Sequence, residues 1–397
     1  MARLDPVTQE RPLLVLLTLM LMLGPFSVDA YLPVMPEIAR DLQASDAVIQ
    51  FTIGGFLIGT AISPLVAGPL SDALGRRGLI LFGLGIFALC AAGGAMAASG
   101  EALVVWRMLQ SLAGASALVA GMAMMADLYE PDTLARRTSL VMVFVSIAPL
   151  IAPVFGAWIA GLSGWRMIFW LIAAASILIT AASVLRLPET LPADRREALQ
   201  PGPLARGYLS VLSNRNAVFY MLGAMGMSSA FFTFLAGAPF LYINHLGLTP
   251  GQFAWIFGAG AGLAILGNMV NIRMVARFGF RYTLVIQGVA MIGLGALFFA
   301  GCFGVLGTWA IFTAGLLIMP AQHLMSANTL AGVLAQFDRR KGMATAVAMS
   351  TRFSCGAIAV WVMGAYGEGV EQFGLILFAC LALSGIFAQL AVRREVF

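Results

Sequence analysis

The stretch GPLSDALGRRG, residues 68–78, is a short polar turn between two long apolar runs. Residues 47–70 precede its charges and residues 78–98 follow them, and each run is long enough to cross the ~30 Å hydrocarbon core of a bilayer as a helix. Asp72, Arg76 and Arg77 supply the charge, and the glycines Gly68 and Gly75 suit close helix approach and a tight turn. The stretch predicts a helical hairpin in a membrane with a charged loop at one surface.

The same pattern of apolar runs and polar turns continues along the chain. Of 397 residues, 60% are hydrophobic and only 10% are charged, whereas soluble domains have about 45–50% apolar and ~25% charged residues. The runs lack the alternation of barrel strands, so the sequence predicts an all-α membrane protein. The twelve predicted transmembrane helices are 12–35, 47–70, 78–98, 102–127, 138–161, 165–186, 215–243, 250–276, 282–304, 307–334, 342–366 and 371–392.

The basic residues indicate how the helices are oriented. If the amino terminus is cytoplasmic, nearly all arginines fall in cytoplasmic loops, only Arg40 and Arg166 fall on the opposite side, and Arg107 and Arg352 lie inside helices. The positive-inside rule predicts this distribution, so we expect both termini in the cytoplasm. The net charge of +5 then reflects topology, and no nucleic acid partner is expected.

The only sizeable hydrophilic stretch separates the sixth and seventh predicted helices. It predicts an N-terminal six-helix bundle, residues 1–186, a cytoplasmic linker, residues 187–214, and a C-terminal six-helix bundle, residues 215–397. Two weak echoes support a repeat: LGRR at 74–77 recurs as FGFR at 278–281, and ARRTSLVMV at 135–143 recurs as DRRKGMATA at 338–346. Parallel six-helix repeats of this kind occur in one large class of transporters.

The opening stretch resembles the GxxxDxxGRR signature, motif A, of the major facilitator superfamily. Gly68, Asp72, Gly75, Arg76 and Arg77 match it, although Ala73 stands where the family has a basic residue. The resemblance implies the major facilitator fold and a cytoplasmic latch. It also implies that an acid at the cytoplasmic end of the fourth helix joins this latch, a place held by Asp127. The alternative is an ordinary cytoplasmic hairpin with arginines that obey the positive-inside rule.

Two charged residues lie inside predicted helices of the first bundle. Arg107 and Gln110 match the RxxQ core of the superfamily's motif B, although Ser111 stands where glycine is common. Asp29 lies ~10 Å from the outer end of its helix and Arg107 ~8 Å from the outer end of its own. Because an isolated charge is costly in a membrane, we predict that they pair and carry proton coupling. The alternative is a purely structural ion pair.

The fifth predicted helix contains SIAPLIAPVFGAW, in which Pro149, Pro153 and Gly156 favour a bend and close packing. It resembles motif C of the drug-exporting antiporters, and the alternative is an ordinary proline-kinked helix.

DAYLPVMPEIARDL at 29–42 resembles the first-helix signature of the bicyclomycin/chloramphenicol resistance (Bcr/CflA) group. That resemblance implies a proton-driven multidrug exporter of the cell inner membrane for compounds such as amphenicols or bicyclomycin, with Asp29 as the group's acidic residue. We expect a monomer whose partners are drug, protons and lipid.

The second bundle carries polar and aromatic residues of its own. Arg352 is near mid-membrane and either binds an electronegative or anionic substrate group, or caps helix carbonyls or lines water. His323 either relays protons or is a hydrogen-bonded packing residue. Phe231 and Phe234 are candidates for an apolar wall of the substrate site. Tyr31, next to Asp29, joins the predicted substrate site.

The sequence leaves two alternative functions, one of which is also a transporter and one of which is not. A proton-coupled uptake symporter for a small metabolite has the same fold, although the AP-x-x-AP helix and the few sugar-binding polar residues disfavour it. A membrane enzyme is disfavoured because the chain has two histidines, no HExxH and no GxSxG, and the four cysteines have no CxxC spacing of a zinc site. A membrane scaffold is disfavoured because it would not need Asp29 and Arg107 buried at matching depth. We therefore predict no catalytic residue, no metal site and no cofactor.

Overall fold

The computed structural model describes residues 11–196, 201–338, 341–366 and 369–396, and in these ranges the regular elements are all helical. The elements are α1 (Arg11–Asp29), η2 (Leu32–Val34), α2 (Met35–Asp41), α3 (Asp46–Leu74), α4 (Arg76–Ala95), α5 (Gly100–Leu128), α6 (Pro131–Val145), α7 (Ala148–Ser163), α8 (Arg166–Arg186), η3 (Ala193–Arg195), α9 (Pro201–Leu212), α10 (Arg215–Pro239), η4 (Phe240–His245), α11 (Pro250–Cys302), α12 (Thr308–Leu334), α13 (Lys341–Tyr366) and α14 (Val370–Val396).

Eleven stretches of the described residues are long and apolar enough to cross a membrane. The longest, α11, has 53 residues, which would extend about 80 Å as one straight helix. Gly279 interrupts it with φ 76° and ψ 161°, so α11 is two spans joined at that glycine. Gly75, between α3 and α4, has φ 97° and ψ 152°. The described residues therefore contain twelve spans, and the two glycines of the sequence repeat adopt closely similar conformations.

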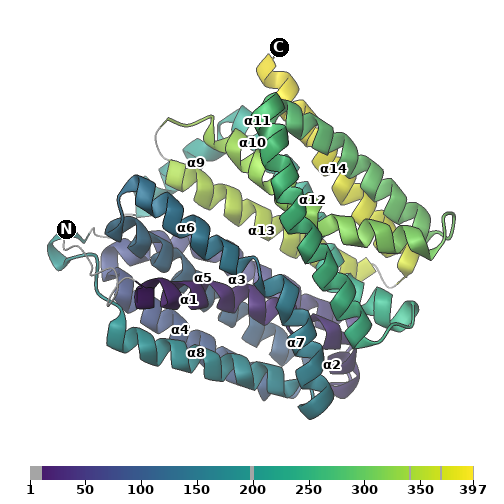
Figure 1. The fold of residues 1–397 in the computed structure, drawn as a ribbon, viewed down its shortest axis with the longest axis horizontal. Coiled ribbons are helices and arrows are strands. Elements are labelled where there is room, and N and C mark those ends of the chain that lie inside the picture. The colour runs from purple at the N-terminus through teal and green to yellow at the C-terminus, as the bar shows by residue number, and fades with distance from the viewer. Residues whose placement is uncertain (1–10, 197–200, 339–340, 367–368, 397) are drawn as a thin grey trace.

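The first six spans lie side by side on one side of the molecule and the last six on the other (Figure 1). We call residues 11–186 the N-terminal half and residues 215–396 the C-terminal half. Helices α3 and α13 pack across the boundary between the halves, as do α7 and α11. Both described chain ends and α9 lie at the same end of the molecule, which we call the terminal end. The opposite end is the distal end.

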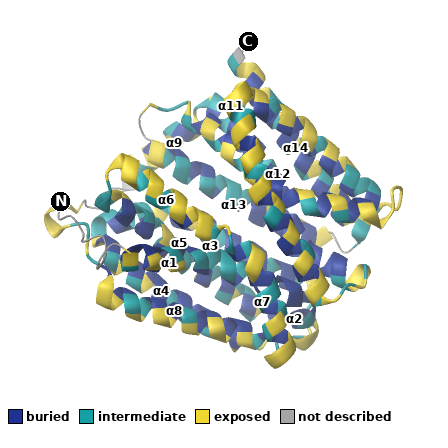
Figure 2. Ribbon diagram, viewed as in Figure 1, coloured by how far each residue is buried: buried dark blue, intermediate teal, exposed yellow. Residues whose placement is uncertain are grey.

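Large apolar side chains are exposed along the outward faces of the helices (Figure 2). Phe82, Leu185 and Trp255, for example, are 68%, 84% and 70% exposed. Such a surface is unfavourable in water but suits the hydrocarbon of a bilayer. The surface and the twelve spans together make the chain a multi-pass membrane protein.

Two predicted spans are broken in the structure, and prolines explain both breaks. The span expected at 12–35 ends its first helix at Asp29, because Pro33 has no N–H to donate to the carbonyl of Asp29. The span expected at 138–161 begins earlier, at Pro131, and is divided into α6 and α7. Pro149 likewise cannot donate to the carbonyl of Val145, where α6 ends.

The linker expected at 187–214 contains a helix, α9, that contacts both halves. The Tyr208 hydroxyl donates to the carbonyl oxygen of Leu65 in the N-terminal half at 3.0 Å. A side chain at Gly207 would meet Met343 of α13. Tyr208 and the fully buried Val211 are three residues apart, a helical spacing that the sequence offers and that predicts one packed face.

Candidate functional site

A cavity of about 340 Å³ lies between the two halves near the middle of the spans. Most of its lining is apolar, as expected for a site that binds small amphipathic molecules. It receives side chains from α1, α3, α4, α5 and α7 of the N-terminal half and from α10, α12 and α13 of the C-terminal half. The predicted site residues that line it are Asp29, Pro149, Phe231, His323 and Arg352.

Asp29 is the last residue of α1 and is 7% exposed. Among the described residues its carboxylate has neither an ion pair nor a side-chain hydrogen bond. An unpaired aspartate in the middle of a transmembrane helix costs about 2.5–3.5 kcal/mol on insertion scales. The structure therefore keeps a carboxylate at the wall of an apolar cavity without a neutralising partner.

Arg107 does not form the predicted ion pair with Asp29. Its guanidinium is fully buried and donates to the Ser27 carbonyl oxygen at 3.2 Å, to Ser27 Oγ at 3.4 Å and to Gln110 Oε1 at 2.6 Å. The Ser27 carbonyl belongs to the last turn of α1, where carbonyls lack intrahelical partners. Arg107 thus caps α1 two residues before Asp29. Its two terminal nitrogens bond to these acceptors in place of the carboxylate, while its Nε has no hydrogen-bond partner among the described residues.

Two aromatic rings lie against Arg107, of which Phe56 lines the cavity and Tyr31 does not. The guanidinium carbon is 4.7 Å from the ring centroid of Tyr31 and 4.5 Å from that of Phe56. Tyr31 is fully buried, and its hydroxyl is 2.9 Å from Thr52 Oγ1. Neither Arg107 nor Tyr31 is among the residues that line the cavity. Both support the α1 break instead of facing the space that a substrate would occupy.

The predicted aromatic wall is only partly formed. Phe231 and Phe232 line the cavity, and the ring of Phe232 is 5.7 Å from that of Phe353. Phe234 faces another direction, packs against Tyr242 with ring centroids 6.4 Å apart, and lines a separate pocket of about 10 Å³. Sequence spacing did not distinguish these faces because the three phenylalanines fall within four consecutive residues.

Arg352 lines the cavity from α13 and has no acceptor among the described residues. Its Nε is buried without a hydrogen-bond partner, and the guanidinium carbon lies 5.2 Å from the ring centroid of Phe353. No helix carbonyl among the described residues accepts a hydrogen bond from Arg352, so the structure does not show the predicted capping role. His323 Nδ1 is 3.0 Å from the Met319 carbonyl oxygen and donates to it, because a carbonyl oxygen can only accept.

The opening stretch of the sequence builds a charged cluster at the terminal end. Arg76 donates to Ser71 at 3.0 Å, to Asp127 at 3.2 Å and to Asp72. Thr190, which the sequence did not suggest, donates to the same Asp127 oxygen at 2.9 Å. We call Asp72, Arg76, Asp127 and Thr190 the latch.

Gly68 departs from its predicted role in close helix packing, since a side chain there would meet no atom within 4 Å. The neighbouring helix is too far away for a glycine to be required at this position. Gly156 shows the opposite: a side chain there would collide with the carbonyl oxygen of Ala30. Because Ala30 follows Asp29, the predicted close-packing residue of α7 presses on the segment that ends α1.

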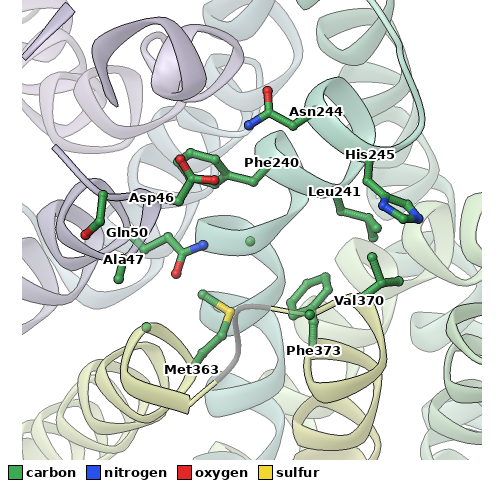
Figure 3. Close-up of a pocket in the computed structure, with 14 residues that line it drawn as sticks. Asp46, Ala47, Gln50, Phe240, Leu241, Asn244, His245, Met363, Val370 and Phe373 are labelled. Atoms are coloured by element: carbon green, nitrogen blue, oxygen red, sulfur yellow. The ribbon is translucent and has the colours of Figure 1, made fainter. Parts of the chain in front are cut away.

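A second cavity, of about 430 Å³, lies between the halves at the distal end (Figure 3). Asp46 and Gln50 line it from α3, and Asn244 and His245 line it from η4. Asp46 and Asn244 thus line the same cavity from opposite sides of the boundary. We call this cavity the distal pocket. The sequence analysis missed it because its residues are nearly 200 positions apart, although polar residues at the ends of two apolar runs were a usable signal.

Comparison with known proteins identifies the family. The family model described as the Major Facilitator Superfamily matches residues 17–360, and the chain belongs to that superfamily. Similar curated proteins include "Uncharacterized MFS-type transporter YdgK" of Bacillus subtilis, 31% identical over 98% of both chains. A "Bicyclomycin resistance protein homolog" of Haemophilus influenzae is 29% identical over 85% of both chains. "Multidrug resistance protein MdtL" of Vibrio parahaemolyticus is 24% identical over 90% of this chain and 89% of its own.

Solved structures share the fold at low sequence identity. A bacterial homologue of the human lysosomal transporter Spinster, inward-facing and occupied, has a TM-score of 0.78 at 16% identity and covers 98% of both chains. The nucleoside transporter NupG has a TM-score of 0.75 at 15% identity and covers 98% of this chain and 100% of its own. These structures show that the chain has the major facilitator fold. As a member of the superfamily, the chain is a membrane transporter of small molecules.

Proposed function

We propose that this superfamily member is a proton-coupled multidrug exporter in the cell inner membrane, with substrates such as amphenicols or bicyclomycin-like compounds. One observation carries the proposal: Asp29, a carboxylate without a counter-charge, lines an apolar cavity between the two halves. The names of the relatives, which refer to bicyclomycin and multidrug resistance, support the choice of substrate class.

In this proposal both termini and the latch face the cytoplasm, which the distribution of basic residues supports. Residues 1–186 and 215–397 move as two units about the central cavity, and residues 187–214 join them. The cavity is formed by both halves of a single chain, so a monomer suffices. The latch fixes the α3–α4 hairpin within the N-terminal unit during this motion.

The central cavity would serve drug and proton in turn. Because an unpaired charge is costly in apolar surroundings, water that enters with each opening of the cavity controls whether Asp29 is charged. A drug that enters from the cytoplasmic side and a proton that enters from the distal side then compete for one site. Arg107 and Tyr31 hold the end of α1, while Phe231, His323 and Arg352 contact the drug and Phe234 supports the wall from behind.

Inverted membrane vesicles with an acidic lumen provide the direct test. We expect the wild-type protein to accumulate chloramphenicol in the lumen and to release lumenal protons as it does so. Asp29→Asn removes the proton carrier but preserves side-chain size, so it should abolish accumulation driven by the pH gradient and retain drug-for-drug exchange. Asp132→Asn, a change at an exposed acid of α6, is the matched control and should retain both.

Two outcomes would contradict the proposal. Proton-driven accumulation by Asp29→Asn at the wild-type rate would remove Asp29 from the coupling step. Drug movement in the same direction as the protons would make the chain a symporter, which is the uptake function considered from the sequence.

A further inference from the structure

Two arginines inside the spans, the fully buried Arg107 and the partly buried Arg352, have different surroundings. Arg107 donates to three acceptor atoms and lies near the aromatic rings of Tyr31 and Phe56. Arg352 donates to no acceptor and forms no ion pair among the described residues, and Phe353 is its only cation–π partner there. A structural arginine in a membrane is expected to resemble Arg107. The unsatisfied donors of Arg352 therefore indicate an acceptor that the protein itself does not supply.

No acidic side chain of the described residues lies within ion-pair distance of Arg352. Besides the central cavity, Arg352 lines a narrow pocket of about 20 Å³. The other residues of that pocket are Met221, Ala224, Ser326, Thr329, Leu330, Val333, Ala348 and Met349, all of them uncharged. Asp29 lines the central cavity but is not within ion-pair distance of Arg352. A drug-sized molecule reaches Arg352 only from the central cavity, because the narrow pocket is about the size of one water molecule.

The surroundings of Arg352 also indicate what kind of molecule would supply the charge. Phe231, Phe232 and Phe353 line the same cavity, with ring centroids of neighbouring pairs 5.1 and 5.7 Å apart. A planar guanidinium binds a carboxylate or sulfonate through two parallel hydrogen bonds, which an ammonium cannot do. An anionic group beside an aromatic wall suits a ligand that carries its charge at one end of a flat apolar body.

We propose that the central cavity transports amphipathic organic monoanions, aryl carboxylates or sulfonates, whose anionic group pairs with Arg352 and whose ring packs against Phe231, Phe232 and Phe353. This inference rests on the proposed exporter function and extends it beyond uncharged antibiotics. It has an electrical consequence: at equal proton stoichiometry, export of the anion moves one more charge than export of its neutral analogue. A potential of 100 mV then changes the limiting accumulation ratio of the anion by an additional factor of about 50.

The test uses a matched ligand pair, naphthalene-2-sulfonate and naphthalene-2-sulfonamide, which share ring and size but differ in charge. The full-length protein is purified, and its affinity for each is measured by titration calorimetry. We expect wild type to bind the sulfonate at least about 10-fold more tightly. Arg352→Gln should bring the two affinities together by weakening the sulfonate alone. Arg352→Lys should retain part of the preference, because it keeps the charge and loses the two-point geometry.

Arg195→Gln, at an exposed position in the linker, is the matched control and should bind both ligands as wild type does. In proteoliposomes, a lumen-positive potential set with potassium and valinomycin should raise sulfonate accumulation more than sulfonamide accumulation. If wild-type protein binds the sulfonate and the sulfonamide equally, the proposal is overturned without any variant. The proposal is also overturned if Arg352→Gln has an unchanged melting temperature and still prefers the sulfonate.

Chloramphenicol transport in the same proteoliposomes separates this inference from the proposed function. Proton-driven chloramphenicol export without a sulfonate preference overturns only the anion proposal. A sulfonate preference without proton-driven export of any compound leaves the Arg352 site standing and overturns the exporter function.

Discussion

A single methyl group at position 156 is expected to disable transport. A Cβ built on Gly156 would lie 1.6 Å from the carbonyl oxygen of Ala30, whereas ordinary contact begins at 3.4 Å, so the two segments must separate by 1.8 Å. Overpacking of this kind costs about 1–3 kcal/mol and occasionally more. Since Ala30 follows Asp29, the shift also moves the carboxylate that lines the cavity. Misplacement of a reacting group by ~1 Å can cost about 100-fold in rate, so we expect Gly156→Ala to lower proton-driven drug transport by a similar factor.

Gly161→Ala is the matched control because it adds the same methyl group to the same helix. A side chain at Gly161 would meet no atom within 4 Å, and alanine favours a helix by up to ~1 kcal/mol over glycine. Transport in inverted vesicles and thermal melting in detergent should therefore be unchanged or improved by Gly161→Ala and impaired by Gly156→Ala. If the two variants melt and transport alike, the contact between α7 and the end of α1 does not position Asp29.

Three further changes have expected outcomes. Gly279→Ala forces a side chain into a backbone conformation, with φ 76°, that only glycine adopts easily. It should lower the melting temperature by the equivalent of ~1–3 kcal/mol. The control Gly262→Ala, where a side chain would meet no atom within 4 Å, should leave the melting temperature unchanged. Arg107→Lys leaves at least one acceptor at the end of α1 without its donor, so it should destabilise by about 1–3 kcal/mol and slow transport; an unchanged melting curve would contradict the capping role. Asn328→Leu removes the donor to two buried amide oxygens and should cost about 1–3 kcal/mol, more than Asn268→Leu in calorimetric melting.

The spans could be predicted from the sequence because hydrophobic length is a strong one-dimensional signal, and the echo of LGRR and FGFR led to the correct pair of glycine turns. The matching depth of Asp29 and Arg107 along their helices was also predictable, since Arg107 contacts Ser27, which is only two residues from Asp29. The rotation of each helix about its own axis was not predictable, because neighbouring residues at the same depth can face different neighbours. For that reason the predicted partner of Arg107 and the predicted face of Phe234 differ from the structure.

The breaks in the first and fifth spans have a signal in the sequence, namely proline. Pro33 and Pro149 each remove one i−4 hydrogen bond, which accounts for the ends of α1 and α6 four residues earlier. Proline alone does not predict a break, since Pro64 and Pro320 lie inside unbroken helices. The distal pocket is different, because Asp46 and Asn244 become neighbours only through packing of the two halves. A residue pair of that kind cannot be found from spacing along a chain.

The two cavities are stacked along the same three helices, which constrains the route of a transported molecule. On α3, Gln50 lines the distal pocket and Ile53, one turn away, lines the central cavity. Beside this stretch the rings of Phe51 on α3 and Trp361 on α13 are stacked with centroids 4.7 Å apart, next to Gly364 and Gly54, although neither ring lines either cavity. Because the rings come from opposite halves, any rotation that separates the halves at the distal end parts them. In the proposed export cycle we expect the same rotation to join the central cavity to the distal pocket, so that a molecule bound between Asp29 and Arg352 would leave past Asp46.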